Sequence, residues 1–221
     1  MGDGMSISIV TPWFEHAELI SNYEAAVRGA EVIIVDTGST PIVHEQLGDM
    51  VDRLGGRLVI DDRPFSFAAA CNQGLNETSG DIVMFLNNDI AADAGWLDQV
   101  ERDVRANPGA LLGPATDVRG LAGRALVYVE GWCIAAERAV WDTLHGWDEE
   151  TFTRPYWEDV DLSWRAVCAG FRLRRRAWPV RHISNVTSNS VAGAKDASEA
   201  NRDALDARIA AYDAAEGVAR I

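Results

Sequence analysis

The chain has 221 residues, 48% of them hydrophobic and 24% charged, a size and composition typical of one domain with a packed core. Its 34 acidic and 20 basic residues give a net charge of −14, which argues against a surface for nucleic acid or anionic membranes. No apolar segment approaches the roughly 20 residues that cross a bilayer, and no charged segment precedes a signal-like core, so we expect a cytoplasmic protein without stable membrane insertion.

Short apolar strands alternate with helical segments through the first half of the chain. We expect strands at 6–12, 31–37, 56–61 and 81–87, with helices at 15–28, 43–54 and 67–77 between them. The central strands are continuous apolar runs, as burial on both faces requires. This rhythm predicts an α/β fold in which helices flank both faces of a mostly parallel sheet.

The pattern is less regular from about residue 110 onward. We expect strands at 110–116 and 124–137, helices at 137–144 and 158–169, and a surface helix from 194 to about 217. No repeat or linker interrupts the chain, so we predict a single domain with halves at about 6–109 and 110–193 and a C-terminal helix at 194–221. Three widely spaced cysteines, an odd number, favour reduced and buried thiols.

Polar residues gather where the predicted strands end: Thr11, Asp36, 61–63 and 87–89. Because ligands bind at the carboxyl ends of strands in open α/β sheets, these residues are predicted to face one cleft. Asp89 is a candidate ligand for a hard divalent cation, although Asn and Asp are also favoured turn residues.

The turn after the second strand could receive a nucleotide. Asp36 offers an acceptor for a base or ribose, and Gly38 lets the backbone approach a ligand closely. No GxGxxG motif accompanies it, so a dinucleotide fold is poorly supported and a single nucleotide stays open.

The segment YWEDVDLSW places acids beside aromatic side chains. Partial desolvation would suit Glu158 or Asp159 to act as a general base, while the helix dipole alone also explains acids in a first turn. Trp132 and Trp157 could stack on a sugar ring or simply pack in the core.

The run FRLRRRAWPVRH concentrates basic residues near the C-terminal end of the predicted sheet. It indicates either a local phosphate site or a solvated strand edge. His182 at its end could join a carboxylate at a manganese site, although a lone histidine is more often structural.

In order and spacing, these elements resemble a GT-A glycosyltransferase, and most closely glycosyltransferase family 2, over about residues 6–190. The matching segments are SIVTPWFEH, VIIVDTGST, FSFAAACNQGLNETSGDIVMFLNND and WEDVDLSWRAVCAGFRL. The resemblance implies a GT-A fold whose first half binds a nucleotide sugar and whose second half binds an acceptor. It also implies inverting, metal-dependent transfer of the sugar to an acceptor hydroxyl.

The same resemblance implies roles for individual residues. Asp159 would be the base for the acceptor hydroxyl, and Asp89 with His182 would hold Mn²⁺ or Mg²⁺ on the diphosphate of a UDP-, dTDP- or GDP-sugar. The implied donor contacts are Thr11, Pro12, Glu15, Asp36, Gly38, Arg63, Asn72, Gly74, Asn87 and Asn88, and the implied acceptor or sugar contacts are Trp132, Trp157 and Glu158. The acceptor is not identified, and a homodimer is left open.

The metal motif reads Asn-Asn-Asp where many family members carry two or three acids. We therefore expect weak metal affinity in the absence of nucleotide. Two alternatives remain. A nucleotidyltransferase would carry a Gly-rich basic loop after the first strand, which TPWFEH is not. A non-catalytic nucleotide-sugar-binding homologue would not need both Asp89 and Asp159.

Overall fold

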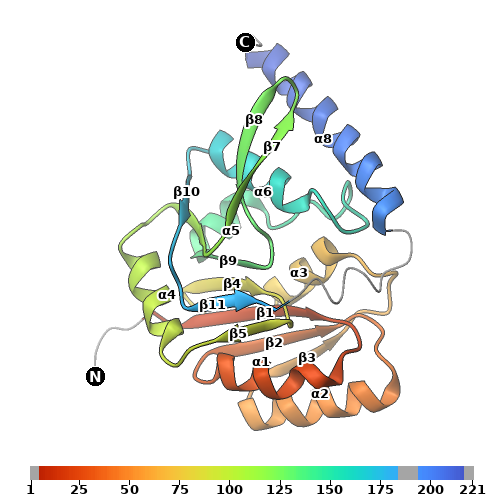
Figure 1. Cartoon of the computed structure of the whole chain (residues 1–221), viewed down its shortest axis with the longest axis vertical. Coiled ribbons are helices and arrows are strands. Elements are labelled where there is room, and N and C mark those ends of the chain that lie inside the picture. Colours follow the sequence, from red (N-terminus) through yellow and green to blue (C-terminus); the bar gives the residue numbers. More distant parts are fainter. Residues whose placement is uncertain (1–4, 184–193, 217–221) are drawn as a thin grey trace.

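The computed structural model describes residues 5–183 and 194–216 of the chain (Figure 1). The expected boundary near residue 193 and the Ser/Asn-rich segment after Ile183 lie outside these residues. A seven-stranded sheet in the order β10-β6-β9-β4-β1-β2-β3 forms the centre of the molecule. Its strands are β1 (Ile7–Trp13), β2 (Glu31–Asp36), β3 (Arg57–Ile60), β4 (Ile82–Leu86), β6 (Ala110–Gly113), β9 (Cys133–Glu137) and β10 (Arg172–Arg175).

The central sheet is mostly parallel. Strands β3, β2, β1 and β4 pair in parallel, as do β10 and β6, and only β9 runs against its neighbours β4 and β6. The predicted α/β fold with a mostly parallel sheet is therefore confirmed. Because these strands run in one direction, the ends of β1, β2 and β4 meet at one edge, which is where the polar residues of the sequence were expected to gather.

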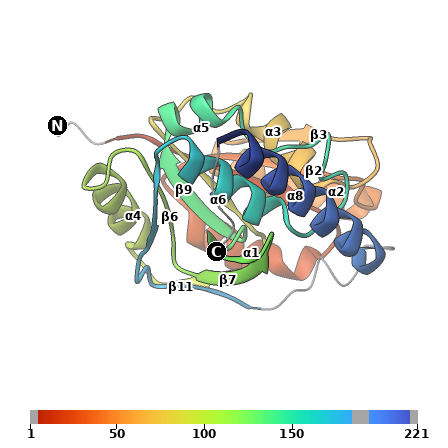
Figure 2. The same cartoon turned by 90° about the horizontal axis from the view of Figure 1, so that it is seen from above.

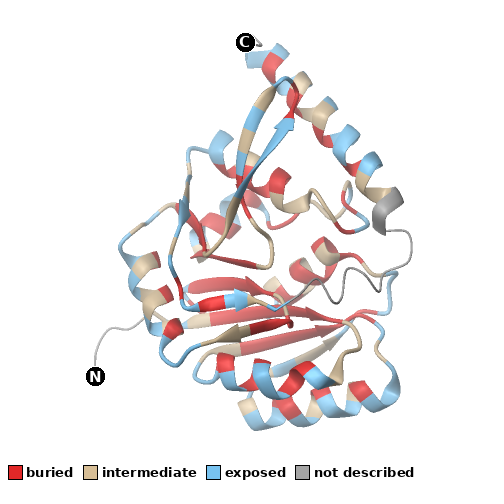
Figure 3. Ribbon diagram, viewed as in Figure 1, coloured by how far each residue is buried: buried red, intermediate tan, exposed pale blue. Residues whose placement is uncertain are grey.

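Two hydrophobic cores lie on the two faces of the sheet. Neighbouring residues of β1 alternate between them, since Ile9 belongs to one core and Val10 to the other. Figure 3 shows the central strands as buried along most of their length. One core contains residues of α1 (Ile20–Val27), α2 (Pro41–Leu54) and α4 (Trp96–Arg105), and the other contains residues of α3 (Phe67–Leu75), α5 (Arg138–Leu144), α6 (Glu158–Cys168) and α8 (Ala194–Glu216).

Helix α3 approaches the sheet most closely at Gly74. A Cβ at this position would lie 2.3 Å from Val10 Cγ1 and 3.0 Å from Val35 Cγ2. The helix–sheet contact therefore requires glycine here, a packing reason beside the nucleotide contact that the family resemblance implies for Gly74.

We expect Gly74→Ala to lower the free energy of unfolding by about 1–3 kcal/mol, because the added methyl overpacks a tight contact. Gly48→Ala on α2 is the matched control, since its Cβ would meet nothing nearer than Leu58 Cδ2 at 4.0 Å. That variant should be neutral or gain up to about 1 kcal/mol from helix propensity. Urea unfolding measures the free energy of unfolding of both variants and of the wild type. An equal change in both variants would contradict the packing argument.

The second half of the chain contains more strands than its sequence predicted. The expected strand at 110–116 is present as β6, which ends at Gly113, and the strand after it, β7 (Thr116–Leu121), was not predicted. The expected strand at 124–137 is wrong as a single element, because it is divided into β8 (Arg124–Val129) and β9. Strands β7 and β8 form a hairpin whose turn residues, Ala122 and Gly123, have φ angles of 50° and 76°. The hairpin extends away from the sheet, and its tip lies beside α8 (Figure 1).

A separate two-stranded sheet pairs β5 (Ile90–Ala92) with β11 (Val180–His182) in antiparallel fashion. Neither β5 nor α4 was predicted from sequence. The expected C-terminal helix is present as α8, but it is more than a surface helix. Its Leu205 and Ile209 are fully buried, and Figure 2 shows it lying alongside α6.

Candidate active site

An open cavity of about 360 Å³ lies at the carboxyl edge of the sheet, beneath the β7–β8 hairpin. It draws side chains from both halves of the chain. Its lining residues are Pro12, Phe65, Phe67, Asn87, Asn88, Asp117, Arg119, Tyr128, Glu130, Gly131, Trp132, Pro155, Tyr156, Glu158, Asp159 and His182.

Asp89 and His182 meet at one side of this cavity. His182 Nε2 lies 2.8 Å from Asp89 Oδ1, and the Asp89 side chain is almost completely buried. The pairing of β11 with β5 brings the two residues together, and the Ile183 amide donates to the Asp89 carbonyl at 2.8 Å. The Trp132 ring stacks on the His182 imidazole with an angle of 2° between the two ring planes, and this contact fixes the orientation of the imidazole.

The Asp89–His182 pair fits two ligands of a divalent cation. Ligands at about 2.1 Å in adjacent octahedral positions lie about 3 Å apart, close to the observed separation of 2.8 Å. Within residues 5–183 and 194–216, no cluster of three or more His, Cys, Asp or Glu side chains suits a metal.

Glu158 and Asp159 begin helix α6 on the other side of the cavity. The chain enters the helix through Tyr156 and Trp157, whose φ angles of 84° and 75° are left-handed. Asp159 Oδ2 accepts a hydrogen bond from the Gly131 amide at 3.0 Å, and Asp159 Oδ1 accepts one from the Val160 amide at 2.9 Å. These two bonds hold the carboxylate at the cavity wall.

Burial changes the proton affinity of both acids. It raises the pKa of Asp159 to about 6, although the Gly131 and Val160 amides act in the opposite direction. Burial and the neighbouring Asp159 charge raise the pKa of Glu158 to about 8. Glu158 Oε2 is buried without a hydrogen-bond partner among the described residues. At neutral pH the pair therefore favours an ionised Asp159 beside a protonated Glu158.

The Glu158 carboxyl makes stability depend on pH in a definite direction. Its pKa is higher in the folded chain, at about 8, than its ordinary 4.5, so its stabilising contribution is full below about pH 4.5 and is lost as the pH rises through about 8. We expect Glu158→Gln to gain stability over the wild type across this window, by at most about 1.4 kcal/mol per pH unit. Urea unfolding at pH 5 and 8 measures this, with the exposed Glu150→Gln as control. If the free energy of unfolding changed equally between pH 5 and 8 in the wild type and in Glu158→Gln, the raised pKa of Glu158 would be contradicted.

Seven of the sequence-predicted site residues line the cavity: Pro12, Asn87, Asn88, Trp132, Glu158, Asp159 and His182. Asp89 joins them through its bond to His182. The strand ends after β4 and β11 and the start of α6 therefore converge as expected.

The ends of β1 and β2 contribute less to the cavity than expected. The Thr11 hydroxyl is fully buried and lies 2.6 Å from the Tyr23 hydroxyl, away from the cavity lining. Asp36 is also buried. Its carboxylate accepts from the Ser39 amide at 2.9 Å and lies 2.7 Å from His44 Nδ1. Thr11 therefore joins β1 to α1, and Asp36 supports the loop after β2.

Glu15 and Gly38 lie in those same loops. The Glu15 carboxylate accepts from the Thr40 amide at 2.9 Å and from the Thr40 hydroxyl at 3.1 Å, so it tethers the start of α2. Gly38 has a φ of 94°, which glycine adopts without strain. Neither residue lines the cavity.

Arg63, Asn72 and Trp157 also lie outside the cavity lining. The Arg63 guanidinium binds the Asp61 carboxylate at 2.8 Å. The Asn72 side chain exchanges two 2.8 Å hydrogen bonds with the backbone of Trp147 and so joins α3 to the loop after α5. These contacts stabilise the walls around the site.

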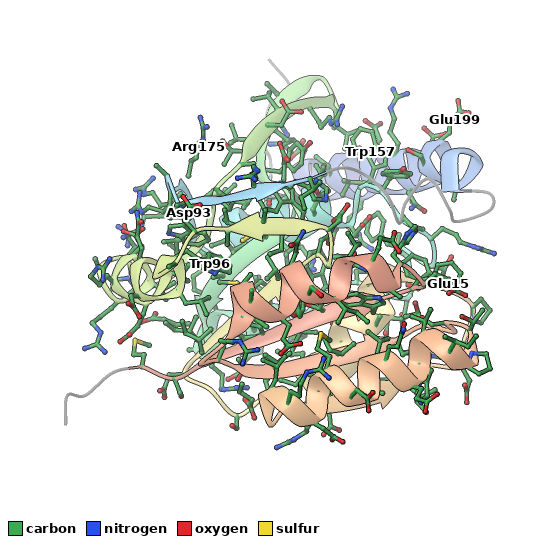
Figure 4. All side chains as sticks on the ribbon, turned by 60° about the horizontal axis from the view of Figure 1, so that its bottom comes forward. Glu15, Asp93, Trp96, Trp157, Arg175 and Glu199 are labelled. Carbon is green, nitrogen blue, oxygen red and sulfur yellow. The ribbon has the colours of Figure 1, made fainter. Side chains whose placement is uncertain are left out.

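The basic run at 171–182 is a strand edge. Arg172, Arg174 and Arg175 are exposed on β10, the outer strand of the sheet, and the first and last of these donate to the carbonyls of Pro108 and Pro114. No arginine of this run lines the cavity. Figure 4 shows Arg175 well away from Trp157, which precedes the acidic start of α6. The solvated-edge interpretation therefore describes the arginines of β10, while His182 at the end of the run lines the cavity.

Sequence reasoning missed the wall formed by the hairpin and by the loop before α3. Arg119 on β7 places its guanidinium carbon 5.8 Å from the Tyr128 ring centre and 5.9 Å from that of Trp157. Phe65 and Phe67 line the opposite part of the cavity. The available signal was the Ala122-Gly123 turn between two alternating segments, which predicts a hairpin.

Residues 8–178 match the sequence profile of Glycosyl transferase family 2. The chain belongs to glycosyltransferase family 2. This membership argues against the nucleotidyltransferase alternative. Every helix in the described part of the chain is too short or too polar to span a bilayer.

Curated relatives of this family 2 chain are much longer than it is. The chain is 28% identical over 197 residues to a pre-mycofactocin glycosyltransferase of Mycobacterium tuberculosis, covering 76% of the chain and 40% of the relative. It is 25% identical over 210 residues to the O-antigen biosynthesis protein RfbC of Myxococcus xanthus, covering 76% and 16%. The chain thus spans less than half of each of these relatives.

Solved structures with the same architecture confirm the GT-A fold of this family 2 chain. GalNAc-T7 with UDP, GalNAc and Mn²⁺ matches with a TM-score of 0.71 and 13% identity, over 82% of this chain and 43% of that one. The mannosyltransferase PcManGT from Pyrobaculum calidifontis, in complex with GDP-Man and Mn²⁺, matches with a TM-score of 0.66 and 17% identity, over 85% and 59%.

Proposed function

We propose that this chain is an inverting, metal-dependent glycosyltransferase that moves a sugar from a nucleotide-diphosphate donor to an acceptor hydroxyl. One observation carries the proposal: a single cavity has Asp159 at one wall and, at another, His182, which bonds to the buried Asp89. The first is suited to take a proton and the second to hold the leaving group. Membership in family 2 supports the same reaction.

Asp159 acts as the general base in this proposal. Its carboxylate removes the acceptor proton as the hydroxyl oxygen attacks the anomeric carbon from the face opposite the diphosphate. The carbon–oxygen bond to the diphosphate breaks, and its electron pair leaves with the nucleotide. A pKa raised to about 6 keeps the carboxylate ionised at neutral pH yet makes it more basic than an ordinary aspartate.

Asp89 and His182 would hold Mn²⁺ or Mg²⁺. A divalent ion there supplies a Lewis acid for the charge on the departing diphosphate. The presence of Mn²⁺ beside UDP or GDP-Man in the two structural neighbours supports this assignment. With only two ligands from the described residues, the ion would be retained mainly in the ternary complex with nucleotide.

The half of the chain at about 6–109 would bind the nucleotide sugar, and the half at about 110–193 the acceptor. The acceptor wall is rich in aromatic rings, including Tyr128, Trp132 and Tyr156. Such rings stack on the apolar faces of sugars, so we propose a carbohydrate or other glycosylated acceptor. Three unpaired cysteines favour a reducing compartment such as the cytoplasm.

The test is nucleotide release from UDP-, dTDP- and GDP-sugars with Mn²⁺, Mg²⁺ or EDTA, in the presence of a panel of sugar acceptors. A thermal-shift panel of nucleoside diphosphates with Mn²⁺ identifies the base first. We expect one donor to turn over only with metal, and the anomeric proton coupling of the product to show inversion. Nucleotide binding without turnover of any donor would instead support a non-catalytic homologue.

A further inference from the structure

Helix α8 contacts the segment of chain that carries Asp159. Three of its side chains, Ser198, Asn201 and Arg208, bond to residues between 148 and 161. They lie on one face of the helix, together with the buried Leu205 and Ile209. The helix lies beyond the residues that match the family profile, which end at 178, so each contact joins the matched region to a helix outside it.

Asn201 holds the loop that leads into the catalytic acid. Its side chain is 6% exposed, and its amide nitrogen lies 3.0 Å from the carbonyl oxygen of Arg154 and 2.9 Å from that of Tyr156. One buried donor group therefore bonds to two carbonyls of the loop. The loop cannot leave this position without breaking both bonds.

The loop needs such support because its backbone is strained. Tyr156 and Trp157 both adopt left-handed φ angles, at 84° and 75°. Conformations of this kind cost about 1–3 kcal/mol for a residue other than glycine and persist only when the surroundings hold them. The strained pair lies directly before Glu158 and Asp159, so relaxation of the loop would rotate the first turn of α6.

Two further contacts hold the same segment. The Trp157 indole donates to the Ser198 hydroxyl at 3.1 Å. Arg208 binds the carboxylates of Asp148 and Asp161 at 2.5 Å each, and Asp161 lies in the first turn of α6. The loop is therefore attached to α8 before, within and after its strained part.

We propose that α8 sets the orientation of the Asp159 carboxylate, with Asn201 as a positioning residue for sugar transfer. The inference rests on the proposed role of Asp159 as the base. A general base must lie within about 3.2 Å of the hydroxyl oxygen whose proton it removes. A displacement of about 1 Å can lower the rate about 100-fold. The Asn201 bonds prevent such a shift without touching either substrate.

The test compares Asn201→Ala and Asn201→Asp with Glu199→Ala. Asn201→Asp keeps the side-chain volume but cannot donate to the carbonyls when ionised, and Glu199 is an exposed residue of the same helix (Figure 4). We expect both Asn201 variants to lower kcat about 10- to 100-fold while the donor KM stays unchanged. Glu199→Ala should behave as the wild type. If the Asn201 variants do not fold, Ser198→Ala removes only the indole bond and should lower kcat about threefold.

A second measurement is independent of turnover. In ¹³C-labelled protein, titration of the Asp159 carboxyl should give a lower pKa in Asn201→Ala than in the wild type, because a loosened loop admits water to the carboxylate. An unchanged pKa and kcat, with only a lower melting temperature, would overturn the inference, as would a donor KM that rises in step with the loss of kcat. A shifted pKa in a protein that transfers no sugar would refute the base role of Asp159 and leave the positioning by α8 intact.

Discussion

Asp159→Asn is expected to lower kcat for sugar transfer by about 10²- to 10⁴-fold, the contribution typical of a general base. The amide keeps the shape of the side chain and can still accept the hydrogen bond from the Gly131 amide, which spans 3.0 Å in the wild type. What it lacks is a basic oxygen. Affinity for the nucleotide should therefore stay within about twofold of the wild type. Initial rates at saturating donor and calorimetric titration with nucleoside diphosphate measure the two quantities separately.

Asp117→Asn provides a control in the same cavity. Asp117 lines the cavity, and its carboxylate accepts a long hydrogen bond from the Tyr128 hydroxyl at 3.3 Å and lies 3.9 Å from the Arg119 guanidinium. The same chemical change there should alter kcat by no more than about threefold. If Asp117→Asn abolished transfer and Asp159→Asn did not, the base would be Asp117. If Asp159→Asn lost nucleotide affinity along with rate, Asp159 would be a donor ligand instead.

Asp89→Ala is expected to weaken nucleotide binding by at least about 10- to 100-fold when Mn²⁺ is present. Substituting a residue that only hydrogen-bonds to a metal ligand already causes a loss of this size, so removing a ligand should cost at least as much. The variant leaves His182 without the carboxylate that lies 2.8 Å from its Nε2 and removes one of two proposed metal ligands. In the wild type, EDTA should weaken nucleotide binding strongly. In the variant, binding with Mn²⁺ and with EDTA should be equally weak.

Asp93→Ala is the matched control for this experiment. Asp93 follows the same short strand, β5, but its side chain is exposed and its contact to β11 is made by the backbone amide, which donates to the Pro179 carbonyl at 2.9 Å. Its removal should leave the EDTA response as in the wild type. An unchanged Mn²⁺-dependent affinity in Asp89→Ala would refute the ligand assignment, and circular dichroism establishes that the variant is folded.

The first half of the fold was predictable because its signals are local. A run such as Ile82–Leu86 is apolar at every position, and burial on both faces of a parallel sheet is the condition that selects for such a run. Once the strands are placed, their parallel order brings their polar ends to one edge. Asp89 could therefore be placed at this edge from its position, while its proposed role as a metal ligand came from the family resemblance.

The rest depended on contacts that a local pattern does not contain. Asp89 and His182 are 93 residues apart in sequence, and strands β5 and β11 that join them have three residues each, too few to show a period. Motif residues such as Asp36 also proved to bind their own loops. The presence of a carboxylate at a strand end does not reveal whether it will bind a ligand or a neighbouring side chain, as Asp36 binds His44.

Because β5 and β11 pair in antiparallel fashion, the side chain that lies beside Asp89 depends on the length of the segment before β11 as well as on the residues of β11. Neighbouring strand residues face opposite sides, so Arg181 is exposed while His182 reaches the cavity. One residue fewer in segment 176–179, which joins β10 to β11, would bring Ile183 to the position of His182, and one residue more would bring Arg181 there. With the insertion, the cavity would contain a permanent cation in place of the imidazole that we propose as a metal ligand. Homologues with a single-residue insertion or deletion at this point are therefore expected to differ in their need for metal, even with every motif of the first half intact.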